Sequence, residues 1–136
     1  ASINTPMAFI EKRRTGNDAK AQALNVVGDI SGKDVILVDD EVDTGGSMIQ
    51  AINLVKETGA RDIYVGFVLP VVSSTAAERL AALPVKQYIT TDTVPVPESK
   101  KALFGDRLTI LTVAPLLGEV IRRANEGRSV GEMFNE

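Results

Sequence analysis

Continuous apolar runs rich in β-branched residues recur along the chain, and each predicts a buried strand. The predicted strands are residues 35–38, 62–68, 86–90 and 107–113. Nearer the N-terminus, residues 7–11 and 22–27 predict two more strands, with a polar and basic loop at residues 12–20 between them. Two strands in this arrangement indicate a β-hairpin with a long loop.

Helical periodicity appears between the predicted strands. Met48, Ala51, Ile52 and Val55 recur at i, i+3, i+4 and i+7, which predicts a helix with one apolar face that ends near Gly59.

Two further helices follow from start and stop signals. Ser73 or Ser74 can cap a helix that runs to Leu83. Pro115 suits the first turn of a helix that ends near Gly127.

The order of the predicted elements indicates the fold class. From residue 35 onwards the chain alternates strand, helix, strand, helix and strand; a loop at residues 92–105, a strand and a helix follow. Strands separated by helices predict an α/β domain with a mostly parallel sheet flanked by helices, here preceded by the hairpin. The 136 residues, 44% of them hydrophobic, fit one such domain.

Composition narrows the chemistry. A net charge of -3 gives no reason to expect nucleic acid or an anionic membrane as a partner. The chain has no histidine and no cysteine, which argues against zinc and favours magnesium held by carboxylates. The sequence contains no apolar run of membrane-spanning length and no signal peptide, so the cytoplasm is the expected compartment.

The acidic-glycine loop, residues 39–47, carries the candidate chemistry. It joins the end of a predicted parallel strand to the start of a helix, the position where open α/β sheets bind ligands. Unpaired amides at a helix start form an anion cradle, suited here to a phosphate monoester. Gly45 and Gly46 allow close approach of the backbone, and Thr44 and Ser47 add hydroxyl donors.

The acids of this loop suit the rest of a sugar phosphate. Asp39 and Asp40 can accept hydrogen bonds from vicinal hydroxyls and share Mg²⁺. Asp43 lies closer to the phosphate end and can position the loop or a water. A plain turn with an aspartate cap would explain one carboxylate and the glycines, but not two successive acids at a strand end. The loop lacks the lysine of a Walker A motif.

The segment VDDEVDTGGSM, residues 38–48, resembles the motif shared by type I phosphoribosyltransferases and ribose-phosphate diphosphokinases. The order of other segments resembles the diphosphokinases. These segments are KRR at residues 12–14, VVGDI with GK at residues 26–33, LTVAPLLGEVIRR at residues 111–123 and SVGEMF at residues 129–134.

The resemblance implies a type I phosphoribosyltransferase-like (Rossmann-like) fold and a transferase of nucleotide biosynthesis. The family converts ribose 5-phosphate and ATP, with Mg²⁺, into phosphoribosyl pyrophosphate and AMP. By resemblance, Asp43, Thr44, Gly45, Gly46 and Ser47 bind the 5-phosphate, and Asp39 and Asp40 bind the ribose hydroxyls and the metal. Lys12 and Arg14 match the mobile catalytic loop of the family.

The resemblance also carries expectations about the rest of the enzyme. Family members have an N-terminal domain that makes most ATP contacts, and residues 1–136 contain only the ribose 5-phosphate-binding domain. The family members are homo-oligomers, and the isolated domain is expected to be inactive. Two alternatives stay open: a type I phosphoribosyltransferase, and a catalytically silent protein associated with the synthase.

Overall fold

The computed structural model describes residues 5–14, 22–73 and 75–134, and it describes the side chains of these residues except 12–14, 22 and 23. In chain order the strands are β1 (Phe9–Arg14), β2 (Gln22–Val27), β3 (Val35–Glu41), β4 (Ile63–Leu69), β5 (Gln87–Thr91) and β6 (Leu108–Leu111). The α-helices are α1 (Gly46–Glu57), α2 (Ala76–Ala81), α3 (Glu98–Phe104) and α4 (Ala114–Asn125). Two 3-10 turns are η1 (Gly105–Arg107) and η2 (Gly131–Phe134).

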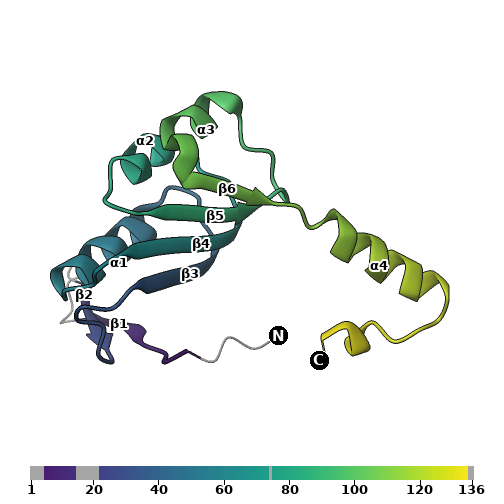
Figure 1. Ribbon diagram of the computed structural model, residues 1–136, viewed down its shortest axis with the longest axis horizontal. Coiled ribbons are helices and arrows are strands. Elements are labelled where there is room, and N and C mark those ends of the chain that lie inside the picture. The colour runs from purple at the N-terminus through teal and green to yellow at the C-terminus, as the bar shows by residue number, and fades with distance from the viewer. Residues whose placement is uncertain (1–4, 15–21, 74, 135–136) are drawn as a thin grey trace.

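Four strands form a parallel sheet in the order β3-β4-β5-β6, and β1 pairs with β2 in an antiparallel hairpin (Figure 1). The predicted fold class is therefore confirmed. Asp39 of β3 pairs with Phe67 of β4, and Glu41 pairs with Leu69. Because the strands are parallel, the segments that follow β3, β4, β5 and β6 all begin at one edge of the sheet.

The core lies on one face of the sheet. Strands that follow one another in chain order and in space, joined by right-handed crossovers, place their helices on the same side. The buried side chains fit this arrangement: Met48, Ile52, Val55, Ile63, Val65, Phe67, Ala76, Ala77, Leu80, Tyr88 and Phe104. Figure 1 shows α1, α2 and α3 packed in this way.

The opposite face of the sheet carries exposed apolar residues. Ile36, Val38, Val68 and Leu111 alternate with the inward-facing positions of their strands and remain largely exposed. Helix α4 projects beyond the end of β6 and contains no buried residue (Figure 1). The helix predicted there is confirmed, but its apolar side chains do not pack on the sheet. No helix in the described ranges is both long enough and apolar enough to cross a membrane.

Two predicted loops contain regular structure. Residues 12–14 were expected in a loop, but their backbone continues β1 and pairs with β2, with Lys12 opposite Leu24. Strand pairing outweighs the polar composition here because a projecting hairpin can expose both of its faces.

The predicted loop at residues 92–105 contains α3. Of the residues of α3, only Phe104 is buried, so the segment lacks the apolar periodicity by which longer helices are predicted. The expected strand at residues 107–113 is shorter, because η1 ends at Arg107 and β6 ends at Leu111.

Candidate functional site

The acidic-glycine loop lines an open cavity of about 400 Å³ at the carboxyl end of β3. The lining residues are consecutive: Asp39, Asp40, Glu41, Val42, Asp43, Thr44, Gly45, Gly46, Ser47 and Met48. The structure therefore gathers all seven predicted substrate-binding residues around one cavity. Val42 and Met48 are buried in the core, which fixes both ends of the loop, while Asp43, Thr44 and Ser47 between them are exposed.

Helix α1 begins at this cavity with its amides uncapped. Gly45 is the N-cap with φ 73° and ψ 1°, a left-handed conformation that glycine adopts at little cost. No side chain caps the helix, and its first turn contains no acidic residue. The first helical hydrogen bond runs from the Ile49 amide to the Gly45 carbonyl, at 2.9 Å. The amides of Gly46, Ser47 and Met48 precede that bond and lie at the positive end of the helix dipole.

Asp39 and Asp40 lie near the end of β3 and line the cavity. Asp39 is half-buried and Asp40 is exposed, and the Asp40 amide donates to Asp39 Oδ1 at 3.0 Å. Successive side chains of a strand leave it on opposite faces, so the two carboxylates face different parts of the site. Within the described ranges, no three acidic side chains converge on one point as a metal cage would require.

The segment that follows β4, residues 70–73, forms backbone hydrogen bonds with the acidic-glycine loop. The Val72 amide donates to the Val42 carbonyl at 2.8 Å, and the Ser73 amide donates to the Asp43 carbonyl at 3.0 Å. Arg79 Nη1 of α2 contacts the Thr44 carbonyl at 3.5 Å. Sequence reasoning did not single out these contacts. The parallel order offered a signal, because residues that follow β4 must lie next to those that follow β3.

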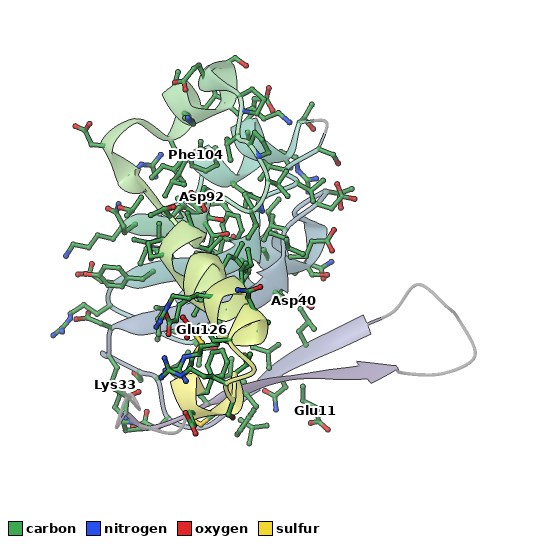
Figure 2. The ribbon with its side chains drawn as sticks, turned by 90° about the vertical axis from the view of Figure 1, so that its right-hand side faces the viewer. Glu11, Lys33, Asp40, Asp92, Phe104 and Glu126 are labelled. Carbon is green, nitrogen blue, oxygen red and sulfur yellow. The ribbon has the colours of Figure 1, made fainter. Side chains whose placement is uncertain are left out.

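The hairpin begins beside the site. A small cavity of about 170 Å³ is shared by Ile10 and Leu24 of the hairpin and by Asp39 and Ser47. In Figure 2 the hairpin projects on the side of the molecule where Asp40 is labelled. The backbone of Lys12 pairs with Leu24, which places the backbone of the predicted catalytic segment at this rim. The side chains of Lys12 and Arg14 lie outside the described part of the structure.

The acid at the end of β5 has a structural role. Asp92 accepts a hydrogen bond from the Val113 amide at 2.9 Å. Hydrogen bonds from the Thr112 side chain and from this amide hold the pKa of Asp92 below its usual value. Asp92 thus fixes the chain between β6 and α4.

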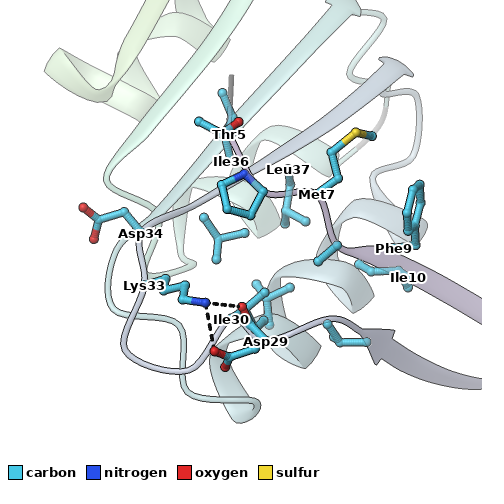
Figure 3. Close-up of a pocket in the computed structure, with 15 residues that line it drawn as sticks. Thr5, Met7, Phe9, Ile10, Asp29, Ile30, Lys33, Asp34, Ile36 and Leu37 are labelled. Atoms are coloured by element: carbon cyan, nitrogen blue, oxygen red, sulfur yellow. Dashed lines mark hydrogen bonds and ion pairs between the residues drawn. The ribbon is translucent and has the colours of Figure 1, made fainter. Parts of the chain in front are cut away.

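A second cavity, of about 260 Å³, lies beside the first half of β3 (Figure 3). Met7, Ile10 and Leu37 contribute to its largely apolar wall. Its Lys33 and Asp29 are paired with each other at 2.8 Å, and the Lys33 hydrogen bond lowers the pKa of Asp29. Apolar walls and charges that are already paired do not suit a phosphate, so we assign the candidate site to the acidic-glycine loop.

Comparisons with known proteins identify the family of the chain. A family model described as "Phosphoribosyl synthetase-associated domain" matches residues 9–135. A ribose-phosphate pyrophosphokinase from Caldanaerobacter subterraneus subsp. tengcongensis is 42% identical over 132 residues, which are 97% of this chain and 40% of that protein. One from Nostoc sp. is 42% identical over 131 residues, 96% of this chain and 38% of that protein.

A solved structure shares the fold. The crystal structure of phosphoribosylpyrophosphate synthetase from Mycobacterium smegmatis matches with a TM-score of 0.78 and 40% identity, over 90% of this chain and 37% of that one. The resemblance inferred from the motifs is therefore confirmed. The chain spans about two fifths of the length of the relatives it matches.

Proposed function

Because the chain belongs to the phosphoribosyl synthetase-associated domain family, we propose that it forms the ribose 5-phosphate site of a ribose-phosphate pyrophosphokinase. In that reaction the anomeric hydroxyl oxygen of ribose 5-phosphate attacks the β-phosphorus of ATP. The bond from the β-phosphorus to the oxygen bridging the α- and β-phosphates breaks, and AMP leaves with that oxygen. The diphosphoryl group ends on the sugar, and the hydroxyl proton is released.

The single observation that carries the proposal is an uncapped helix start next to two carboxylates. The amides of Gly46, Ser47 and Met48, with the hydroxyls of Thr44 and Ser47, form a donor set for the 5-phosphate. Asp43 lies at the same cavity and positions the loop or a water. Binding the phosphate end fixes the sugar, and so converts the attack on ATP into a well-oriented step.

Asp39 and Asp40 bind the other end of the substrate. Their carboxylates accept hydrogen bonds from the ribose hydroxyls, which only a sugar ligand offers. They also fit Mg²⁺, which proteins hold through one or two carboxylates together with substrate oxygens and water. When bound, the metal neutralises charge on the phosphate oxygens. The role of the two side chains is to orient the ring so that its anomeric oxygen faces the nucleotide.

Lys12 and Arg14 supply positive charge from the hairpin. Their backbone continues β1 outward from Ile10, which lines a small cavity together with Asp39. The transition state spreads negative charge over the transferred phosphate oxygens, and fixed cations lower its energy more than that of the ground state.

The remaining functions require sequence beyond these residues. We propose that residues 1–136 form one domain that binds ribose 5-phosphate. Most contacts to ATP then come from the part of the relatives that this chain does not match. We further propose that the complete enzyme is a cytoplasmic homo-oligomer.

Calorimetric titration of the purified chain with ribose 5-phosphate in the presence of MgCl₂ tests the proposal. We expect saturable binding, tighter than for ribose or inorganic phosphate alone, because only the sugar phosphate uses both halves of the site. With ATP added, we expect no steady-state formation of phosphoribosyl pyrophosphate. Equal affinity for ribose 5-phosphate and inorganic phosphate would contradict the split site, and robust turnover would contradict the need for further sequence.

A further inference from the structure

Val72 has an unusual backbone conformation. Its φ is 42°, and within the described ranges every other residue with positive φ is a glycine. A β-branched residue in the left-handed region is strained, because its Cβ crowds the neighbouring carbonyl. The side chain of Val72 is buried in the core, with 2% of its surface exposed. Contacts around Val72 must therefore hold this conformation against its cost.

Three hydrogen bonds hold the backbone around Val72. Its amide donates to the Val42 carbonyl at 2.8 Å, and the next amide, of Ser73, donates to the Asp43 carbonyl at 3.0 Å. The Val72 carbonyl accepts from Lys100 Nζ of α3, at 2.5 Å. The first two bonds end on the acidic-glycine loop, so the strained residue connects α3 to the proposed phosphate site.

The hydrogen bonds to the carbonyls of the acidic-glycine loop fix the direction of its amide groups. The carbonyls of Val42 and Asp43 both face residues 70–73, and Arg79 contacts the carbonyl of Thr44 from the same part of the fold. In a trans peptide the N–H points opposite to the preceding carbonyl. The amides of Asp43 and Thr44 are therefore turned away from residues 70–73, and the amide of Gly45 is turned away from Arg79. Successive amides that point the same way form an anion-binding concavity, which adds to the helix start.

Lys100 differs from its neighbour on the same helix. Lys101, which is half-buried as Lys100 is, pairs with Glu98 at 2.7 Å, three residues earlier on the same helix. Lys100 is half-buried and reaches a main-chain carbonyl 28 residues earlier in the chain. A cationic donor to a carbonyl forms a stronger bond than a neutral donor does, so it can offset backbone strain at a single residue.

We propose that Lys100 is a positioning residue: by holding the Val72 carbonyl it keeps the amides of the acidic-glycine loop turned to receive the substrate phosphate. The inference deepens the proposed function and rests on it for the identity of the ligand. It assigns no catalytic role to Lys100, which acts through Val72 and the loop. Loss of the ammonium leaves the core side chains in place but removes one of the three hydrogen bonds that hold the backbone at Val72.

Lys100→Met, Lys100→Arg and the matched control Lys101→Met test this inference in the full chain. We expect Lys100→Met to bind ribose 5-phosphate and inorganic phosphate about tenfold more weakly, because both ligands use the loop amides. Lys100→Arg keeps a cationic donor and is expected to recover most of the affinity. Lys101→Met is expected to bind as the unaltered chain does. The melting temperature of Lys100→Met should fall by less than about 5 °C.

Amide NMR spectra without ligand give a separate readout. We expect Lys100→Met to shift the resonances of Thr44, Gly45 and Gly46, with Lys101→Met leaving them in place. Unchanged resonances, or shifts of equal size in both variants, would overturn the inference even if the unaltered chain bound no sugar phosphate. Failure of the unaltered chain to bind would instead refute the proposed function. If Lys100→Met unfolds, resonances of Lys100→Arg that match the unaltered chain support the inference, and resonances displaced in that variant overturn it.

Discussion

At the scale of single residues, the proposed site combines main-chain hydrogen-bond donors with side-chain acceptors. Amides at the start of α1 offer donors that only substitution by proline can delete, whereas Asp39 and Asp40 offer side-chain acceptors that many substitutions delete. A phosphate needs only the donors, and a pentose needs only the acceptors. The two ligand halves should therefore respond differently to the same substitution.

The double variant Asp39→Asn with Asp40→Asn separates the two halves. We expect about tenfold weaker binding of ribose 5-phosphate, because amides are poorer acceptors than carboxylates and do not hold Mg²⁺. Inorganic phosphate should bind with unchanged or slightly higher affinity, since two negative charges near it are gone. Calorimetry with both ligands measures the difference.

A matched control for that variant is Glu57→Gln with Asp106→Asn, which removes two exposed acids that do not line the cavity. It should leave both affinities unchanged. Equal losses for both ligands in the Asp39 and Asp40 variant would contradict the assignment of sugar and phosphate to separate groups.

The residues that line the candidate site were predictable from the sequence. The residues that hold the acidic-glycine loop in place were not. Two successive aspartates near a strand end, followed by two glycines and two hydroxyl residues at the start of a helix, predict a ligand-binding loop by local chemistry alone. Lys100 and Val72 carry no such local signal. Their importance comes from contacts across 28 residues of chain, which exist only once α3 and β4 are packed.

At the scale of elements, Tyr88 ties β5 to α2. The ring is fully buried, and its hydroxyl donates to the Leu80 carbonyl at 2.6 Å. The ring also packs edge-on against Phe104 of α3, with ring centroids 4.9 Å apart. Burial raises the pKa of Tyr88 to about 12. One side chain thus links three elements of the fold: β5, α2 and α3.

Tyr88→Phe should lower the free energy of unfolding by about 1–2 kcal/mol at neutral pH, because the Leu80 carbonyl loses its buried donor. The folded state holds the phenol proton more tightly than the unfolded chain, in which the pKa is near 10. The stability that comes from this difference is complete below pH 10 and is lost as the pH rises towards 12. The difference in free energy of unfolding between Tyr88→Phe and the unaltered chain should therefore become smaller from pH 10 to pH 12. Urea titrations at several pH values would measure this difference.

Tyr64→Phe provides the matched control, since Tyr64 lies on the open face of β4 and is not fully buried. It should cost little at neutral pH. If the difference in free energy of unfolding between Tyr88→Phe and the unaltered chain stayed constant between pH 8 and 11, burial would not raise the pKa of Tyr88.

Long elements were easier to predict than short ones, for a physical reason. Helix α1 presents Met48, Ile52 and Val55 to the core, and that repeat is visible in the sequence. Helix α3 presents only Phe104, so a pattern-based reading finds a loop. The signals that were present, Pro97 before the first turn and Gly105 after the last, mark turns as often as helix ends.

At the scale of the whole molecule, residues 114–134 form an appendage with its own interactions. Glu119 pairs with Arg122 and Arg123, and Arg123 also contacts the Ser129 carbonyl and Glu132. All of these partners lie in the same segment, and no residue of α4 is buried.

A chain that ends at Val113 should therefore unfold cooperatively, with a free energy of unfolding within about 1 kcal/mol of the full chain. It should also bind ribose 5-phosphate with unchanged affinity, because α4 contributes nothing to the lining of the cavity. Urea unfolding and calorimetry of the shortened chain measure both quantities. Loss of cooperative unfolding would mean that α4 packs on the sheet in solution.

The position of β3 at the border of the sheet has a consequence for self-association. Among the described strands β3 bonds only to β4, so its outer main-chain groups and the exposed Ile36 and Val38 offer a template to a second chain. The carboxylates of Asp39 and Asp40 follow this stretch, and like charges oppose the pairing of two copies. We therefore expect a variant that neutralises both acids to pair along β3 with a second chain more readily than the unaltered chain does.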